Sequence, residues 1–105
     1  MPLPTTLESF RTSVEADHPP VAMSGALLAL WWAKKGDWER AHATAQADHS
    51  REGAWVHGHL HRVEGDLDNA GYWYGQSGRA RSTLPLDEEW DKIAATLIAS
   101  APASA

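Results

Sequence analysis

The amino-acid sequence predicts an all-α domain of five or six helices, and three observations support this fold class. Alanine is abundant and β-branched residues are few among the 105 residues, which favours helix over sheet. Apolar residues recur at helical spacing in several stretches. A Gly-Asp pair also repeats, because the segment KGDWERA (35–41) returns 29 residues later as EGDLDNA (64–70). Such a repeat predicts two helical hairpins within one domain.

Prolines and a glycine delimit the first two expected helices. The pair Thr5-Thr6 can cap a short helix near 7–17, which ends at His18-Pro19-Pro20 because residues before proline avoid helical angles. A second helix is expected over 21–35, with Gly36 as its C-terminal stop.

The later helices follow similar signals. They are expected over 38–48, 51–64, 67–77 and 86–100. Asp37, Ser50 and Asp66 can each cap one of these helices by accepting a backbone N–H. The repeat core spans about residues 21–78, and the last helix is expected to cover the second hairpin as a C-terminal cap. The Ala/Ser/Pro tail 101–105 is expected to be disordered.

The repeated unit resembles the tetratricopeptide repeat, a helical hairpin of about 34 residues. That family places Gly-Asp at the turn between its helices, with small and aromatic residues at fixed packing positions. The residues of this chain at those positions are Ala29, Trp32, Ala41, Gly58, Ala70 and Tyr74. The resemblance covers about 25–78 and departs in its shorter period and in the missing terminal proline. It implies two tetratricopeptide-like hairpins with flanking capping helices.

Charge and composition exclude several classes of protein. The net charge of −5 disfavours nucleic acid and anionic membranes as partners, because both need a basic surface. The chain has no cysteine and therefore no disulfide or thiol chemistry. The longest apolar stretch, Ala26–Ala33, is too short to cross a bilayer, and the N-terminus lacks a signal-peptide pattern. A cytoplasmic protein is therefore expected.

Three histidines in one stretch are the strongest chemical signal. On a helix, His57 and His61 are four residues apart and share one face, whereas His59 points nearly to the opposite side. His42 on the preceding helix can approach this pair, with Gln46 one turn further along. Imidazoles that meet at one point can bind a divalent metal. We therefore take His42, His57 and His61 as candidate metal ligands.

Two other interpretations compete with a metal site. In a β-strand, His57, His59 and His61 would share one face, but Gly58 weakens a strand and no βαβ pattern surrounds the stretch. In the tetratricopeptide alignment, His57 and His61 take interior positions instead, which predicts a buried polar seam. Candidate partners for their nitrogens are Gln46, Glu52, Glu64, Asn69 and Tyr72. The His-Glu-x-x-His motif of zinc peptidases is absent.

The stretch also resembles a narrower, uncharacterised group of small bacterial and fungal proteins. Their pattern is Ala-His-x-x-x-Gln, followed by Trp-x-His-x-x-x-His-Arg-x-Glu-Gly-Asp-x-x-Asn-Ala-x-Tyr-Trp. This chain matches the pattern over about 41–78, and Gly71 departs from the larger residue usual there. The residues so marked are His42, Gln46, His57, His61, Arg62, Glu64, Asn69, Tyr72 and Trp73. The resemblance implies a shared site or a shared core.

Two hypotheses about function follow. The first is a non-enzymatic module that binds a protein or peptide, or forms a homodimer through exposed tryptophans, and it needs no cofactor. It leads because helical repeats usually bind and because no nucleophile–base pair is visible. The second is a protein that binds a divalent metal or a small molecule at His42, His57 and His61, with hydrolysis as one use of the metal.

Overall fold

The computed structural model describes residues 5–20 and 23–100. Its helices are α1 (Leu7–Ser13), α2 (Gly25–Lys35), α3 (Trp38–Ala47), α4 (Arg51–Glu64), α5 (Leu67–Ser77) and α6 (Leu86–Ser100). These residues contain no β-strand, so the predicted all-α fold is confirmed and the strand interpretation of the histidine stretch is wrong. The tail 101–105, predicted to be disordered, lies outside the described residues.

Two helix limits differ from the prediction, whereas the other helices match it to within one residue. α1 ends at Ser13, four residues earlier than expected, because residues 14–16 form only tight turns. α2 begins at Gly25, four residues later than expected, because the Ser24 hydroxyl caps it by accepting a backbone N–H. Residues 21–22, also expected in this helix, lie outside the described part.

The repeated Gly-Asp pairs form the same turn in both hairpins. Gly36 and Gly65 end α2 and α4 in the left-handed region, with φ of 91° and 85°. Glycine adopts this conformation without the steric penalty of a Cβ atom. Asp37 and Asp66 follow, and each carboxylate accepts the backbone N–H three residues on, which caps α3 and α5. The repeat in sequence is therefore a repeat in backbone geometry.

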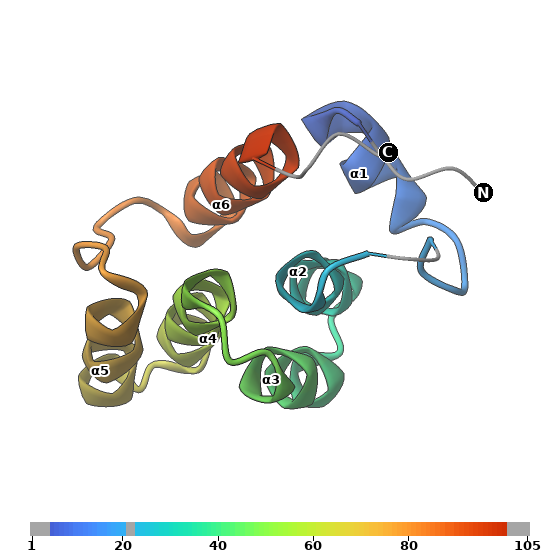
Figure 1. The fold of residues 1–105 in the computed structure, drawn as a ribbon. Coiled ribbons are helices and arrows are strands. Elements are labelled where there is room, and N and C mark those ends of the chain that lie inside the picture. Colours follow the sequence, from blue (N-terminus) through green and yellow to red (C-terminus); the bar gives the residue numbers. More distant parts are fainter. Residues whose placement is uncertain (1–4, 21–22, 101–105) are drawn as a thin grey trace.

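The α2–α3 and α4–α5 hairpins lie side by side, with α4 in the middle of the molecule (Figure 1). α4 packs against α2, α3, α5 and α6. Every residue from Gly53 to His61 is consequently buried, whatever its polarity. The polar side chains of a helix enclosed on all sides need hydrogen-bond partners within the protein, because an unpaired buried polar group is costly.

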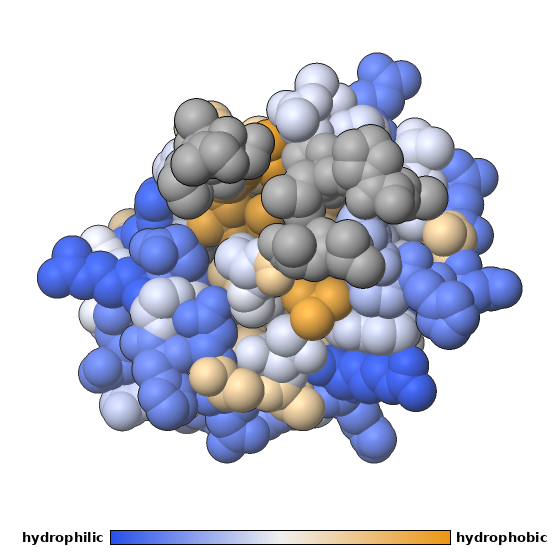
Figure 2. All heavy atoms as spheres, turned by 45° about the vertical axis from the view of Figure 1, so that its right-hand side comes forward, coloured by the Kyte–Doolittle hydropathy of each residue, from blue (hydrophilic) through white to orange (hydrophobic). Residues whose placement is uncertain are grey.

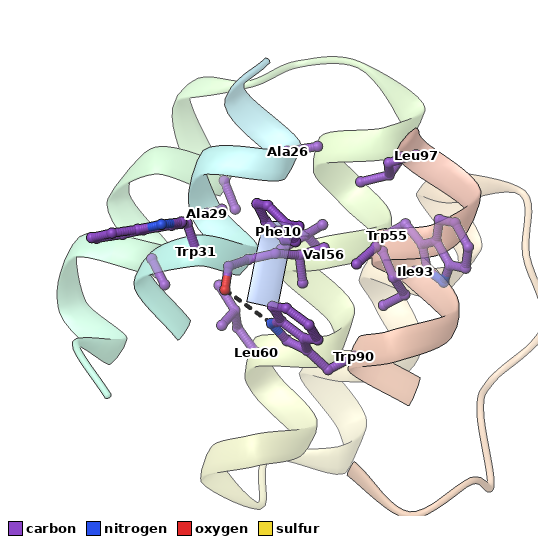
Figure 3. Close-up of a cluster of buried hydrophobic side chains, with 14 of the residues drawn as sticks. Phe10, Ala26, Ala29, Trp31, Trp55, Val56, Leu60, Trp90, Ile93 and Leu97 are labelled. Atoms are coloured by element: carbon purple, nitrogen blue, oxygen red, sulfur yellow. Dashed lines mark hydrogen bonds between the residues drawn. The ribbon is translucent and has the colours of Figure 1, made fainter. Parts of the chain in front are cut away.

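α6 packs across both hairpins. The sequence had predicted that it would cover only the second hairpin. It contacts α4 of the second hairpin, α2 of the first, and α1. Trp90 of α6 stacks on Phe10 with ring centroids 5.4 Å apart. Its indole Nε1 also donates to the Leu30 carbonyl at 2.9 Å, the dashed bond in Figure 3. Burial of each such side chain contributes about 1.5–3 kcal/mol, so α6 fixes the two hairpins to each other.

Few large apolar side chains are exposed in the described residues. Trp31, Trp55 and Trp90 are buried, and Trp32, Trp38 and Trp73 are half-buried. None of the six tryptophans is fully exposed, and a homodimer through tryptophans stays a prediction. Figure 2 shows one face that is mostly hydrophilic, with hydrophobic residues gathered near its middle. No described helix combines the length and the apolar character needed to span a bilayer.

Candidate metal centre

Three imidazoles from two helices meet at the seam between the hairpins. α3 supplies the half-buried His42, and α4 supplies the buried His57 and His61 one turn apart. One ring nitrogen from each residue lies within 4.8 Å of the other two. His57 Nε2 is 3.0 Å from His42 Nε2. The four-residue spacing on α4 and the adjacency of α3 therefore bring together the three histidines that the sequence singled out.

The contact between His42 and His57 leaves one nitrogen without a partner. Only one of the two Nε2 atoms can carry the shared proton. If His57 Nε2 donates, its Nδ1 is a bare lone pair, and if His42 Nε2 donates, His57 Nδ1 carries the hydrogen. In both arrangements His57 Nδ1 is buried and forms no hydrogen bond to the described residues. The metal-free seam is therefore not a fully satisfied polar network.

Two tryptophans enclose the histidines. Trp73 of α5 stacks on His57 with ring centroids 3.9 Å apart, and Trp38 of α3 stacks on His42 at 4.7 Å. The Trp38 indole is fixed in place, because its Nε1 donates to the Leu60 carbonyl at 2.9 Å. These rings cover one face of His57 and one face of His42 with apolar surface.

A carboxylate orients the third histidine. His61 Nδ1 lies 2.9 Å from a Glu64 carboxylate oxygen, so this nitrogen is the donor and Nε2 keeps its lone pair. Metal-binding histidines usually donate their second N–H to a carboxylate or a carbonyl in this way. Asp66 lies near the same pair, but it is exposed and its carboxylate caps α5. Glu64 is therefore the one predicted partner that the structure brings to the seam.

The environment favours the neutral forms of His42 and His57. Burial first, and then the neighbouring His42 and His61, lower the pKa of His57 to about 4. Burial and His61 also lower the pKa of His42. Neutral imidazole is the form that binds a metal. Protons therefore compete less with a metal for the lone pairs of His42 and His57 at pH 7.

The donor set and the spacing fit a tetrahedral zinc-like ion. Zinc–nitrogen bonds of about 2.0–2.1 Å place two ligand nitrogens about 3.3 Å apart. The 3.0 Å separation of the His42 and His57 Nε2 atoms is close to this value. His61 needs only a small movement, since all three nitrogens lie within 4.8 Å. Three nitrogen ligands leave at least one coordination position for water or another ligand.

Comparisons of the chain with protein-family models, with curated proteins and with solved structures found no match. The tetratricopeptide resemblance and the narrower bacterial and fungal resemblance therefore stay predictions, and the site is interpreted from its geometry.

Several residues marked by the sequence lie away from the histidines. Gln46, Asn69 and Tyr72 are exposed, and their side chains form no hydrogen bond to the seam among the described residues. Tyr72 instead meets Trp73 edge-on with ring centroids 5.1 Å apart. Arg62 points toward α6. Of the proposed residues, His42, His57, His61, Glu64 and Trp73 form the cluster.

The structure contains a second polar cluster that the sequence interpretation missed. Glu89 of α6 is buried and accepts from His59 at 2.7 Å, from Arg62 at 2.6 Å and from the Tyr74 hydroxyl. Burial alone raises the pKa of Glu89, but the hydrogen bonds that it accepts, from His59 first, hold the pKa below its usual value. A signal was available, because Glu89 is in helical register with the buried Ile93 and Leu97.

Proposed function

We propose that the protein binds a divalent transition-metal ion of the zinc type through His42, His57 and His61. The observation that carries this proposal is the convergence of three imidazole nitrogens within 4.8 Å of one another. Surface histidines rarely meet in this way, because each prefers water. Here α3 and α4 hold them against two tryptophan rings.

The residues around the seam have separable roles in this proposal. His42, His57 and His61 are the ligands, Glu64 fixes the ring of His61, and the tryptophans cover two of the rings with apolar surface. A bound zinc ion supplies Lewis acidity and lowers the pKa of a water ligand, which is the chemistry needed for hydrolysis. Both carboxylates that lie near His61 in the described residues are engaged, since Glu64 is bonded to His61 and Asp66 caps α5. Binding is therefore the core of the proposal.

A zinc titration tests it. Protein treated with EDTA and dialysed is titrated by calorimetry, and we expect about one zinc ion per chain. His42→Ala is expected to weaken binding by more than the roughly 10–100-fold that loss of an orienting partner costs. His49→Ala is the matched control, because His49 is exposed on the α3–α4 connection and lies outside the cluster. Equal zinc affinity in both variants, or no stoichiometric binding, would refute the proposal.

A protein- or peptide-binding module is the second candidate function. Its specific support is a set of exposed large apolar side chains: Val63, Leu67, Tyr72, Leu84 and Leu86. Leu67 is 60 % and Tyr72 58 % exposed, and both belong to α5, an outer helix of the molecule (Figure 1). A light-scattering mass of one chain at micromolar concentration would remove the homodimer from this candidate. A cytoplasmic location also stays a proposal.

A further inference from the structure

His59 lies on the side of α4 away from the three clustered histidines and is only 2 % exposed. Its Nδ1 is 2.7 Å from a Glu89 carboxylate oxygen. A carboxylate accepts, so Nδ1 carries the hydrogen and Nε2 carries the lone pair in the neutral ring. In its neutral form the residue is therefore a hydrogen-bond acceptor whose orientation is set by Glu89 of α6.

Glu89 itself is held by several donors. Arg62 and the Tyr74 hydroxyl also donate to its carboxylate, and Arg62 is fixed in turn by the Leu84 carbonyl at 2.7 Å. Both carboxylate oxygens are thus occupied. The position and tautomer of His59 are consequently fixed by a network that joins α4, α5 and α6.

The second nitrogen of His59, Nε2, has no hydrogen-bond partner in the described residues. It is also not fully buried without a partner, since His57 Nδ1 is the only such atom in the described residues. His59 lines a hollow of about 390 Å³, a volume within the roughly 300–1,000 Å³ of ligand pockets.

The rest of the cavity wall is mostly apolar. The lining residues are Ala33, Lys34, Gly36, Trp38, His59, Leu60, Val63, Leu86, Asp87 and Trp90. The indole N–H groups of Trp38 and Trp90 are already used, because they donate to backbone carbonyls at 2.9 Å. Leu60 and Trp90, labelled in Figure 3, bring α4 and α6 together at this hollow. His59 is thus the histidine of a mostly apolar wall that also carries two exposed charged residues, Lys34 and Asp87, with the Lys34 ammonium 4.9 Å from the centroid of the Trp90 ring.

We propose that this cavity binds a small apolar molecule, aromatic in the best case, that carries one hydroxyl or N–H group. The donor bonds to His59 Nε2, and the ring packs against Leu60, Val63 and Leu86 of the cavity wall. This chemistry matches an acceptor beside apolar side chains, because an aromatic ring gains contact area there and its donor satisfies the open nitrogen. The site is separate from the three-histidine cluster and does not depend on a metal.

The test uses p-cresol as the probe and its methyl ether as a matched probe without a donor. Both are titrated into the full chain in the presence of EDTA, and ¹H–¹³C NMR follows the His59 ring and the Leu86 methyl groups. We expect saturable shifts with p-cresol and an affinity for the ether that is about two- to tenfold lower, the effect of one hydrogen bond. Equal affinity for the two probes, or no saturable shift, would overturn the proposal.

Two substitutions locate the binding. Leu86 is partly exposed at the cavity wall, so Leu86→Trp fills the hollow and is expected to lower p-cresol affinity at least about tenfold. Leu67→Trp is the control, because Leu67 is exposed and does not line this cavity. Unchanged binding in Leu86→Trp, or equal loss in both variants, contradicts the assignment. The comparison of the two probes on the unsubstituted chain does not depend on either variant folding.

Discussion

His57 Nε2 lies 3.0 Å from His42 Nε2, and this contact joins the last helix of the first hairpin to the first helix of the second. Whichever ring donates, His57 Nδ1 stays buried without a partner. An unsatisfied buried polar atom costs about 1–3 kcal/mol. The protein therefore carries an unsatisfied nitrogen in the same ring whose Nε2 we propose as a metal ligand.

The substitution His57→Phe tests the cost of the unpartnered nitrogen separately from metal binding. Phenylalanine keeps the ring stacked on Trp73 and removes the unpartnered nitrogen, while the half-buried His42 can turn to water. We expect the metal-free variant to be as stable as the parent, or more stable by up to about 2 kcal/mol, and to lose the rise in melting temperature that zinc gives the parent. Thermal unfolding with and without zinc measures both effects.

His59→Phe is the contrasting variant for that experiment. It places the same side chain two residues along α4 but removes a donor from the buried Glu89. We expect it to lower stability by about 1–3 kcal/mol. If His57→Phe is destabilised as much as His59→Phe, the unpartnered nitrogen is not the destabilising group.

The free energy of unfolding of the metal-free protein is expected to fall in acid over a defined range of pH. The pKa of His57 falls from 6.5 to about 4 on folding, so the unfolded chain binds a proton that the folded chain rejects. The free energy of unfolding should therefore fall as the pH drops below about 6.5, and this loss should be complete near pH 4. Its size is about 3 kcal/mol, from about 1.4 kcal/mol per unit of pKa.

Urea unfolding of EDTA-treated protein at several pH values measures this loss. His57→Phe should show a flatter profile between pH 6.5 and 4, because one of the two histidines with a lowered pKa is gone and only His42 remains. Glu89 also has a lowered pKa, but its contribution is lost only below its ordinary value of 4.5, so the two ranges differ. An identical slope in parent and variant above pH 4.5 is the outcome that contradicts the assignment.

The sequence predicted most of the fold because its signals are local. Gly36 and Gly65 allow the left-handed turn, and the aspartate that follows each one caps the next helix. The meeting of His42, His57 and His61 was also predictable, since it needs only helical spacing and two consecutive helices. Both cases depend on residues that are near in sequence or in adjacent elements.

What the sequence did not predict depends on tertiary packing. Glu89 bonds to His59 and Arg62, which are 30 and 27 residues away, across the loop that leads into α6. No local signal in the sequence indicates which face of α4 the α6 helix packs against after this loop. Gln46 shares a face with His42 by spacing alone, yet it is exposed. The burial of α4 on all sides follows from α6 packing over both hairpins.

Removal of the Glu89 charge is expected to be far more damaging than removal of a surface carboxylate. Glu89→Gln breaks a buried ion pair with Arg62 and leaves a half-buried guanidinium without its counter-ion. Breaking one partner of such a pair costs about 3–5 kcal/mol. Asp91→Asn is the control on the same helix, because Asp91 pairs with Arg11 near the surface and such pairs contribute about 0–1 kcal/mol. The free energies of unfolding of the two variants, measured by chemical denaturation, should differ by at least about 2 kcal/mol. Equal losses of stability would show that the Glu89 network contributes no more than a surface pair.

Two glycine substitutions test how closely α4 and α5 approach. A Cβ atom on Gly58 would lie 3.3 Å from the Ala70 carbonyl oxygen and from the Tyr74 ring. The first belongs to the α5 backbone, and the second is held by the bond from its hydroxyl to Glu89, so neither can easily move. Gly58→Ala should therefore lower stability by about 1 kcal/mol or more, even though alanine is the better helix former.

Gly75→Ala in α5 should instead raise stability by up to about 1 kcal/mol, because nothing lies within 4 Å of the added atom. Urea unfolding of both variants gives the two signs, and stabilisation by Gly58→Ala would mean that the two helices are not in the close contact on which the shape of the histidine seam depends.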